Sequence, residues 1–165
     1  MSAQLNFDAA PRCEPMTVAD LDAVQAIECA VYEFPWTRAN FVDSLAAGYL
    51  AQLLRDAQGA LCAYCVAMYG VQEVHLLNLT VAPALQHRGL GRDLLDRLVS
   101  ASREAGARWL WLEVRASNLR ARAVYRRYGF DDIGSRRGYY PAAAGQREDA
   151  CVMRLALSGE RDALE

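Results

Sequence analysis

One short run in the middle of the chain has the composition of a phosphate-binding turn. It follows an apolar stretch that ends at Val81, precedes a long segment with helical periodicity, and reads Gln86-His87-Arg88-Gly89-Leu90-Gly91-Arg92. The two glycines have no Cβ atom, so the backbone can approach a ligand closely. The first N–H groups of a following helix would point at an anion, and the two arginines could pair with its oxygens. The sequence therefore predicts a phosphate seat where a strand passes into a helix.

A single carboxylate lies in a second apolar stretch. If residues 109–114 form a strand, its period of two places Glu113 on the same face as Trp109 and Trp111. Desolvation against tryptophan would make this carboxylate a better proton acceptor. Glutamate is seldom buried, however, so a solvated strand end is the more frequent reading of such a residue. The pattern alone leaves both interpretations open.

Two polar residues share one face of the next predicted helix. Asn118 and Tyr125 are seven residues apart, which is two helical turns. Asn118 is a candidate N-cap for this helix, and Tyr125 taken alone is equally a core aromatic. The following Tyr128 is expected in the core.

The elements around these residues predict an α/β fold with a mixed sheet. Thr17 and Asp20 have the spacing of a capping box, and Thr37 is a candidate cap for a second helix after the break at 34–36. Apolar periodicity predicts helices over 21–31, from 37 to Gly48, 90–105 and 118–128, and strands over 49–55, 61–69, 74–81, 109–114, 130–136 and 150–157.

Length and composition indicate one globular domain over residues 1–165, with an ordered core of about 12–157, a loose lead-in over 1–11 and a polar tail over 158–165. The net charge is −2, with both signs scattered, which gives no basic footprint for nucleic acid. All 18 basic residues are arginines, so phosphate-loop and Schiff-base lysine chemistry is excluded. We expect a cytoplasmic protein without a signal or membrane segment.

The five cysteines do not have the spacing of a metal site. Cys62 and Cys65 are three apart in a predicted strand, so their side chains point to opposite faces. We expect buried thiols and no metal.

Taken together, these motifs resemble the GNAT-type N-acetyltransferases, and within them the branch that acetylates the N-terminal alanine of ribosomal proteins. The resemblance rests on residues 81–91, the segment Trp111-Leu112-Glu113-Val114-Arg115-Ala116-Ser117-Asn118, then Tyr125, Gly129-Phe130, Tyr139-Tyr140-Pro141 and Arg147-Glu148-Asp149-Ala150. It covers about 16–157. It implies a mixed, mostly antiparallel central sheet that is flanked by helices and splayed around an acetyl-CoA site.

The resemblance also implies roles for individual residues. Glu113 matches the general base, and Tyr125, twelve residues on, matches the general acid that protonates the departing CoA thiolate. An asparagine at position 118 would contact acetyl-CoA as well as cap its helix. The remaining acetyl-CoA contacts would be Leu79, Thr80, Val81, Gln86, His87, Arg88, Gly89, Leu90, Gly91 and Arg92, and the acceptor contacts Phe34, Trp36, Tyr139 and Tyr140.

The implied reaction is direct acetyl transfer, in a ternary complex, to the N-terminal alanine of a small-subunit ribosomal protein, with other N-terminal peptides as further acceptors. A small-molecule amine or a lysine side chain is the alternative acceptor. Two rival classes are an acyl-CoA-binding regulatory module and a dinucleotide-binding fold. The second would use Glu113, 22 residues beyond Gly91, for a ribose, but its third glycine would fall at Leu94.

Overall fold

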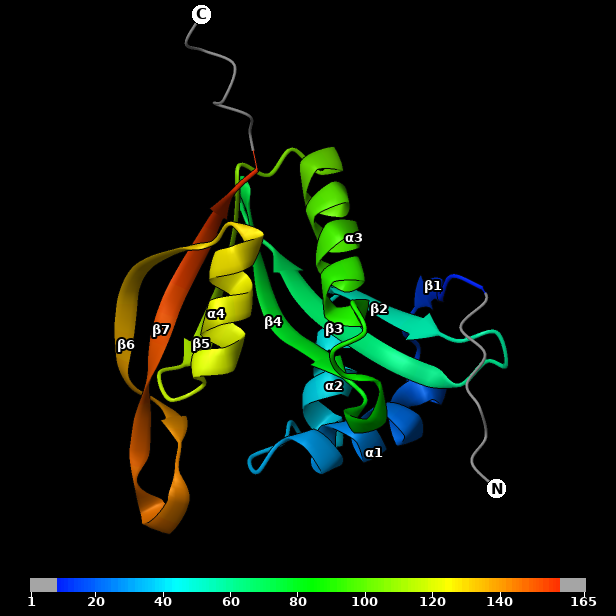
Figure 1. Ribbon diagram of the computed structural model, residues 1–165, viewed down its shortest axis with the longest axis horizontal. Coiled ribbons are helices and arrows are strands. Elements are labelled where there is room, and N and C mark those ends of the chain that lie inside the picture. Colours follow the sequence, from blue (N-terminus) through cyan, green and yellow to red (C-terminus); the bar gives the residue numbers. More distant parts are fainter. Residues whose placement is uncertain (1–8, 158–165) are drawn as a thin grey trace, which may run out of the picture. The chain divides into compact units, whose positions relative to one another are not determined.

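The computed structural model describes residues 9–157, so most of the predicted lead-in and the whole predicted tail lie outside the described residues. Within this range, seven strands form one sheet in the order β1-β2-β3-β4-β5-β7-β6 (Figure 1). The strands are β1 (Arg12–Pro15), β2 (Leu50–Arg55), β3 (Leu61–Tyr69), β4 (Glu73–Val81), β5 (Trp109–Arg115), β6 (Asp131–Pro141) and β7 (Arg147–Ala156).

The predicted caps at Thr17, Thr37 and Asn118 are confirmed. The helices are α1 (Leu21–Val31), α2 (Arg38–Ala46), α3 (Leu90–Glu104) and α4 (Leu119–Tyr128), with 3-10 turns at Val18–Asp20, Pro83–Leu85 and Ala143–Gly145. Thr17 and Asp20 form the capping box ahead of α1, and the side chains of Thr37 and Asn118 cap α2 and α4. These caps satisfy N–H groups that a helix leaves unpaired in its first turn. Among residues 9–157, no helix is long and apolar enough to cross a membrane.

By its internal contacts the chain divides into two compact units. The first unit comprises Met1–Val66 and Asn78–Leu94, and the second comprises Ala67–Leu77 and Leu95–Glu165. The phosphate-binding turn belongs to the first unit, and Glu113, Asn118 and Tyr125 belong to the second.

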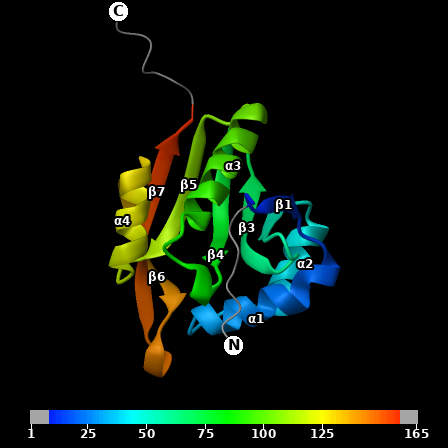
Figure 2. The same ribbon diagram turned by 45° about the vertical axis from the view of Figure 1, so that its right-hand side comes forward.

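In the first unit, α1 and α2 lie side by side in both views (Figures 1 and 2). Strand β1 pairs antiparallel with β2, with Arg12 opposite Arg55. The core includes Leu21, Val24, Phe41, Leu53 and Tyr64, each fully buried. The face of α1 differs from the prediction in one respect: the expected Ile27 and Val31 are only half-buried, and Glu28 is buried in their place.

In the second unit, β5 pairs antiparallel with β7, and β7 pairs antiparallel with β6. The predicted alternation along β5 is confirmed, since Leu110, Leu112 and Val114 are buried while the alternate residues are half-buried. Strand β5 also pairs in parallel with the first part of β4, over Glu73–Leu76 and Trp109–Leu112. Both strands continue beyond these four pairs.

The strand predictions differ from the structure in two respects. Strand β1 was not predicted, because its backbone pairs with β2, a contact distant in sequence that short-range pattern does not contain. Strands β6 and β7 were expected to end at Arg136 and to begin at Ala150. They extend to Pro141 and from Arg147, because the hairpin resumes pairing beyond an irregularity between Arg136 and Tyr140.

Candidate active site

The predicted phosphate seat in the first unit has the backbone of an anion-binding turn. His87 and Gly89 have φ angles of +65° and +84°, a left-handed conformation that residues with a side chain rarely adopt. Helix α3 begins at the next residue, so its first N–H groups lie directly after this turn. Alternation of left- and right-handed residues turns successive N–H groups toward one point, where an anion can bind.

The turn is fastened to the end of β4. A Cβ atom on Gly91 would lie 3.7 Å from Val81 Cγ2 and 3.8 Å from Leu79 Cδ2, so the backbone here packs directly on the strand. The side-chain amide of Gln86 donates to the Val81 carbonyl at 3.3 Å. This donor set suits a pyrophosphate: backbone N–H groups and a helix N-terminus are supplied by a turn whose position is fixed by β4.

The predicted contact Thr80 is engaged within the first unit. Its hydroxyl lies 2.8 Å from that of Tyr32 and donates to Asn78 Oδ1 at 2.7 Å. Burial raises the pKa of Tyr32, so its phenol stays protonated and can donate to the Leu79 carbonyl at 3.3 Å. The Thr80 side chain is therefore held by contacts within the protein.

Glu113 in the second unit is buried, because its side chain is only 4% exposed. His75 of β4 stands opposite Trp111 of β5, and their rings stack at 3.8 Å between centroids, with an angle of 12° between the planes. This stack places His75 Nε2 within hydrogen-bonding distance of Glu113 Oε2. The strand pairing thus orients the carboxylate through an imidazole that tryptophan holds in place.

The other oxygen of Glu113 faces a cation. Arg136 Nε of β6 lies 3.0 Å from Glu113 Oε1. The guanidinium of Arg136 also lies over the rings of Trp111 and Tyr139, at 5.7 Å and 5.4 Å. Burial raises the pKa of Tyr139, and the charge of Glu113 raises it further while Arg136 opposes this. Tyr139, predicted as an acceptor contact, therefore belongs to the surroundings of the carboxylate.

The second predicted tyrosine of the hairpin contacts a different group. Tyr140 packs edge-on against Tyr139 at 4.9 Å, and the Arg115 guanidinium lies 4.6 Å from its ring centroid. Arg115 also donates to the Pro141 carbonyl at 2.8 Å and pairs with Glu148 at 3.3 Å. Hydrogen bonds from Ser117, and secondarily Arg115, lower the pKa of Glu148. These contacts tie the loop end of the β6–β7 hairpin to the end of β5.

Helix α4 carries the other two predicted residues of the second unit. The side chain of Asn118 accepts from the Ala121 N–H at 3.1 Å, which confirms its capping role. Tyr125 is half-buried and meets Phe130 edge-on at 5.5 Å. The prediction of a core position for Tyr128 was wrong: it is half-buried, and its hydroxyl donates to Asp96 at 2.7 Å.

The predicted acceptor residues of the first unit lie on the connector between α1 and α2. Trp36 packs on Phe41 with ring centroids 5.2 Å apart, while Phe34 is 37% exposed. The buried Glu28 accepts from the Trp36 N–H at 2.9 Å, and Gln25 donates to the Trp36 carbonyl at 2.8 Å. Hydrogen bonds to the backbone of Trp36 therefore hold the connector, and Phe34 is partly exposed to solvent.

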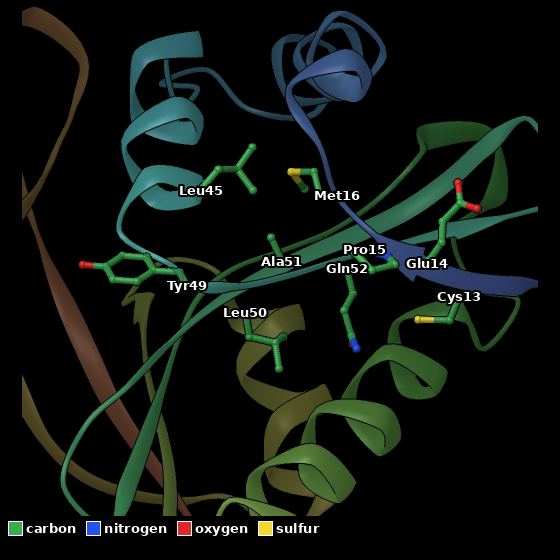
Figure 3. Close-up of a pocket in the computed structure, with 9 residues that line it drawn as sticks. All are labelled: Cys13, Glu14, Pro15, Met16, Leu45, Tyr49, Leu50, Ala51 and Gln52. Carbon is green, nitrogen blue, oxygen red and sulfur yellow. The ribbon is translucent and has the colours of Figure 1, made fainter.

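A separate pocket of the first unit contains none of the predicted site residues. It encloses about 440 Å³ and is lined by residues of β1, β2 and the end of α2 (Figure 3). Leu45, Met16 and Ala51 gather on one side of β2, while Leu50 and Gln52 project to the other (Figure 3). The carboxylate in its lining, Glu14, is paired with Arg55, so we assign the pocket no chemistry.

His75, Arg136 and Glu28 were not predicted as site residues. The described residues contain no group of three or more histidine, cysteine or acidic side chains that could hold an ion. Cys62 and Cys65 are buried, as expected. The available signal was a polar residue with apolar residues on both sides, which marks both His75 in β4 and Glu28 in α1.

The strand–turn–helix phosphate seat and the oriented carboxylate are what an acetyl-CoA-dependent transferase requires, and the comparisons with known proteins agree. Residues 21–130 match the model of the acetyltransferase (GNAT) family, and the chain belongs to this family of acetyl-CoA-dependent N-acetyltransferases.

Among individual relatives, the chain is 38% identical over 143 residues to the [ribosomal protein bS18]-alanine N-acetyltransferase of Escherichia coli (strain K12), covering 87% of this chain and 95% of that protein. The enzyme of the same name from Haemophilus ducreyi is 35% identical over 144 residues, with 87% and 99% covered.

Solved structures give the same result for the fold. The crystal structure of the Escherichia coli ribosomal-protein-S18-alanine N-acetyltransferase superposes with a TM-score of 0.83 at 36% identity, covering 94% of this chain and 99% of that one. A phosphinothricin acetyltransferase from Sinorhizobium meliloti, solved with acetyl-CoA, has a TM-score of 0.75 at 20% identity, with 91% and 90% covered. The second likeness concerns the fold alone. The predicted GNAT fold is confirmed.

Proposed function

We propose that this protein transfers the acetyl group of acetyl-CoA to the N-terminal α-amino group of a ribosomal protein, with alanine as the first residue. The observation that carries the proposal is the likeness to the bS18-alanine N-acetyltransferases over almost their full length. Supporting it, the segment with Glu113 lies on a buried strand and is held by a stacked histidine. A regulatory module that only binds acyl-CoA would have no need for an oriented carboxylate.

In this proposal Glu113 is the general base. An α-amino group has a pKa near ~8, so most acceptor molecules are protonated at neutral pH and cannot attack a thioester. The carboxylate takes a proton from the acceptor nitrogen, directly or through a water molecule. The nitrogen then forms a bond to the carbonyl carbon of the thioester, and the bond between that carbon and sulfur breaks.

Tyr125 is the proposed general acid, which gives its hydroxyl proton to the departing thiolate. The anionic end of acetyl-CoA is held by the turn from Gln86 to Arg92, and Asn118 adds a contact beyond its cap. Phe34, Trp36, Tyr139 and Tyr140 are the proposed acceptor contacts. Both substrates are bound at once, so no acetylated cysteine forms.

A panel of acceptors tests this function. The protein is incubated with acetyl-CoA and with peptides that begin with alanine, peptides whose amine is a lysine side chain, and polyamines, and the products are identified by mass. We expect acetylation of the α-amino group of the alanine peptides, with N-terminally blocked peptides as the control. Preferential acetylation of lysine side chains or polyamines would contradict the proposal.

Binding of the acetyl donor is measured separately. At about a hundredfold excess of CoA over its dissociation constant, the free energy of unfolding should rise by ~2.7 kcal/mol. Gly89→Val should abolish this rise, because valine disfavours the φ of +84° and its side chain would meet the ligand. Stabilisation by NADH instead of CoA would overturn the assignment of the turn.

A further inference from the structure

The surroundings of Glu113 contain two unsatisfied polar atoms. Glu113 Oε1 and Trp111 Nε1 are both buried, and neither has a hydrogen-bond partner among the described residues. Arg136 Nε is 3.0 Å from Glu113 Oε1, close enough for an ion pair, but its N–H does not form a hydrogen bond there. A buried acceptor left without a donor is costly, so this oxygen is available to a better-aligned donor.

The two partners of Glu113 differ in how firmly they are held. The side chain of His75 is 10% exposed and is stacked on Trp111. The side chain of Arg136 is 48% exposed, and its contacts beyond Glu113 are with the faces of two aromatic rings. Only the Arg136 end of this pair is exposed to solvent, so the guanidinium can return to water at little cost while the carboxylate stays buried. Arg136 is therefore the partner that can leave, while His75 keeps the carboxylate in position.

The place where the Arg136 guanidinium lies is suited to a cation of another molecule. It is bounded by a carboxylate oxygen and by the faces of Trp111 and Tyr139. Aromatic faces together with a carboxylate attract ammonium groups as well as guanidinium groups. A peptide N-terminus carries such an ammonium and, three bonds further on, a carbonyl oxygen that could accept from an N–H such as that of Trp111.

We propose that Arg136 is a placeholder for the acceptor: its guanidinium occupies the ammonium subsite formed by Glu113, Trp111 and Tyr139, and the N-terminal ammonium of the peptide displaces it. The proposal rests on the proposed function in one respect, since it takes Glu113 as the base. On displacement, Arg136 turns to solvent, and the acceptor ammonium donates to Glu113 Oε1, which then takes its proton. Arg136 thereby competes with the acceptor and sets the affinity for it.

The test compares wild type with Arg136→Ala, using Arg137→Ala as a control that removes the same charge from the adjacent position of β6. In Arg136→Ala, the KM for an alanine-initiated peptide should fall roughly two- to fivefold, because the guanidinium that competes for the subsite is gone. The KM for acetyl-CoA and kcat should stay near the wild-type values. Arg137→Ala should leave both KM values unchanged.

Methylguanidine provides a second measurement. It carries the same cation as the deleted side chain, so it should bind Arg136→Ala in the presence of CoA and compete with the peptide, and bind wild type much more weakly. Isothermal titration calorimetry reads this binding without turnover. If alanine peptides are not acetylated but methylguanidine still binds selectively to Arg136→Ala, the subsite stands and the proposed function fails.

The opposite results would overturn the placeholder. If Arg136→Ala lowers kcat and leaves the KM for the peptide unchanged or raised, Arg136 positions Glu113 instead of competing with the acceptor. If the peptides are acetylated but methylguanidine does not discriminate between Arg136→Ala and wild type, the subsite is wrong while the function holds. Equal stabilisation of all variants by CoA shows that each is folded.

Discussion

Glu28 in the first unit and Glu113 in the second both have buried carboxylates, and the two are satisfied in different ways. Glu28 in the first unit is 1% exposed and accepts from the main-chain N–H of Trp36, the hydroxyl of Tyr64 and the amide of Asn78, so neutral donors reach both oxygens. Glu113 in the second unit has an imidazole at one oxygen and no hydrogen bond at the other.

This difference separates a carboxylate that stabilises the fold from one that is available for chemistry. The lone pairs of Glu28 are used to join α1, β3, β4 and the connector at Trp36, which leaves little for a ligand. Glu113 Oε1 has an ion pair with Arg136 but no hydrogen bond, and buried groups that lack a hydrogen bond call for an explanation such as a functional role. Burial of the two side chains alone would not have distinguished the structural role of Glu28 from the chemical role of Glu113.

The largest effect is expected from removing the structural carboxylate. Glu28→Ala leaves a backbone N–H, a hydroxyl and an amide buried without their acceptor, each of which costs about 1–3 kcal/mol. The free energy of unfolding in urea should therefore fall by at least about 3 kcal/mol. Glu28→Gln should lose less, because its carbonyl oxygen can still accept from the Trp36 N–H. A loss below about 1 kcal/mol in Glu28→Ala would show that this network does not hold the first unit together.

The second carboxylate should behave in the opposite way. Glu113→Gln keeps the shape of the side chain but removes the base, so turnover should fall on the order of 100-fold while CoA binding and stability change little. The residual rate should rise with pH, as the acceptor amine loses its proton unaided. Glu104→Gln, an exposed acid at the end of α3, is the control for loss of a charge. Full activity of Glu113→Gln at neutral pH would remove it from the role of base.

The sequence was sufficient for the features that local chemistry determines. The turn at Gly89 could be predicted because glycine there permits a left-handed backbone, and the caps at Thr37 and Asn118 because their side chains bond to neighbours three residues away. The inward residues of α3 and β5 could be predicted because their periods are 3.6 and 2.

The partners of the two carboxylates could not be predicted. His75 reaches Glu113 from 38 residues away through the parallel pairing of β4 with β5, and Asn78 reaches Glu28 from 50 residues away. Arg136 depends on the register of the β6–β7 hairpin, whose irregularity no local pattern specified. The family resemblance pointed to Glu113 as the general base, but its burial and its partners depend on these contacts between residues distant in sequence.

A smaller effect on turnover is expected from removing the proposed general acid, Tyr125. Tyr125→Phe removes one hydroxyl and keeps the ring against Phe130, so stability should be retained and turnover should fall less than in Glu113→Gln. The defect should shrink further with a thioester whose thiol is more acidic, because that thiolate leaves without a proton. Glu113→Gln should show no such rescue, since its defect lies at the amine. Wild-type activity of Tyr125→Phe with acetyl-CoA would exclude it as the acid.

The smallest effect is a loss of folding stability at alkaline pH, which comes from two buried groups of the first unit, Cys65 and Tyr64. Burial raises the pKa of Cys65 to about 12, and burial with the hydrogen bond to Glu28 raises that of Tyr64. The folded protein therefore keeps protons that the unfolded chain releases above about pH 9, so this stabilisation is complete below pH 9 and is lost as the pH rises toward 12. For Cys65 alone the loss is at most about 1.4 kcal/mol per pH unit.

Urea unfolding between pH 8 and 10.5 measures this loss. The free energy of unfolding should decline less steeply with pH for Cys65→Ala than for wild type. Cys29→Ala, which removes an exposed thiol, should follow wild type. Identical declines for all three proteins would mean that the Cys65 thiol ionises as readily in the folded protein as in the unfolded chain.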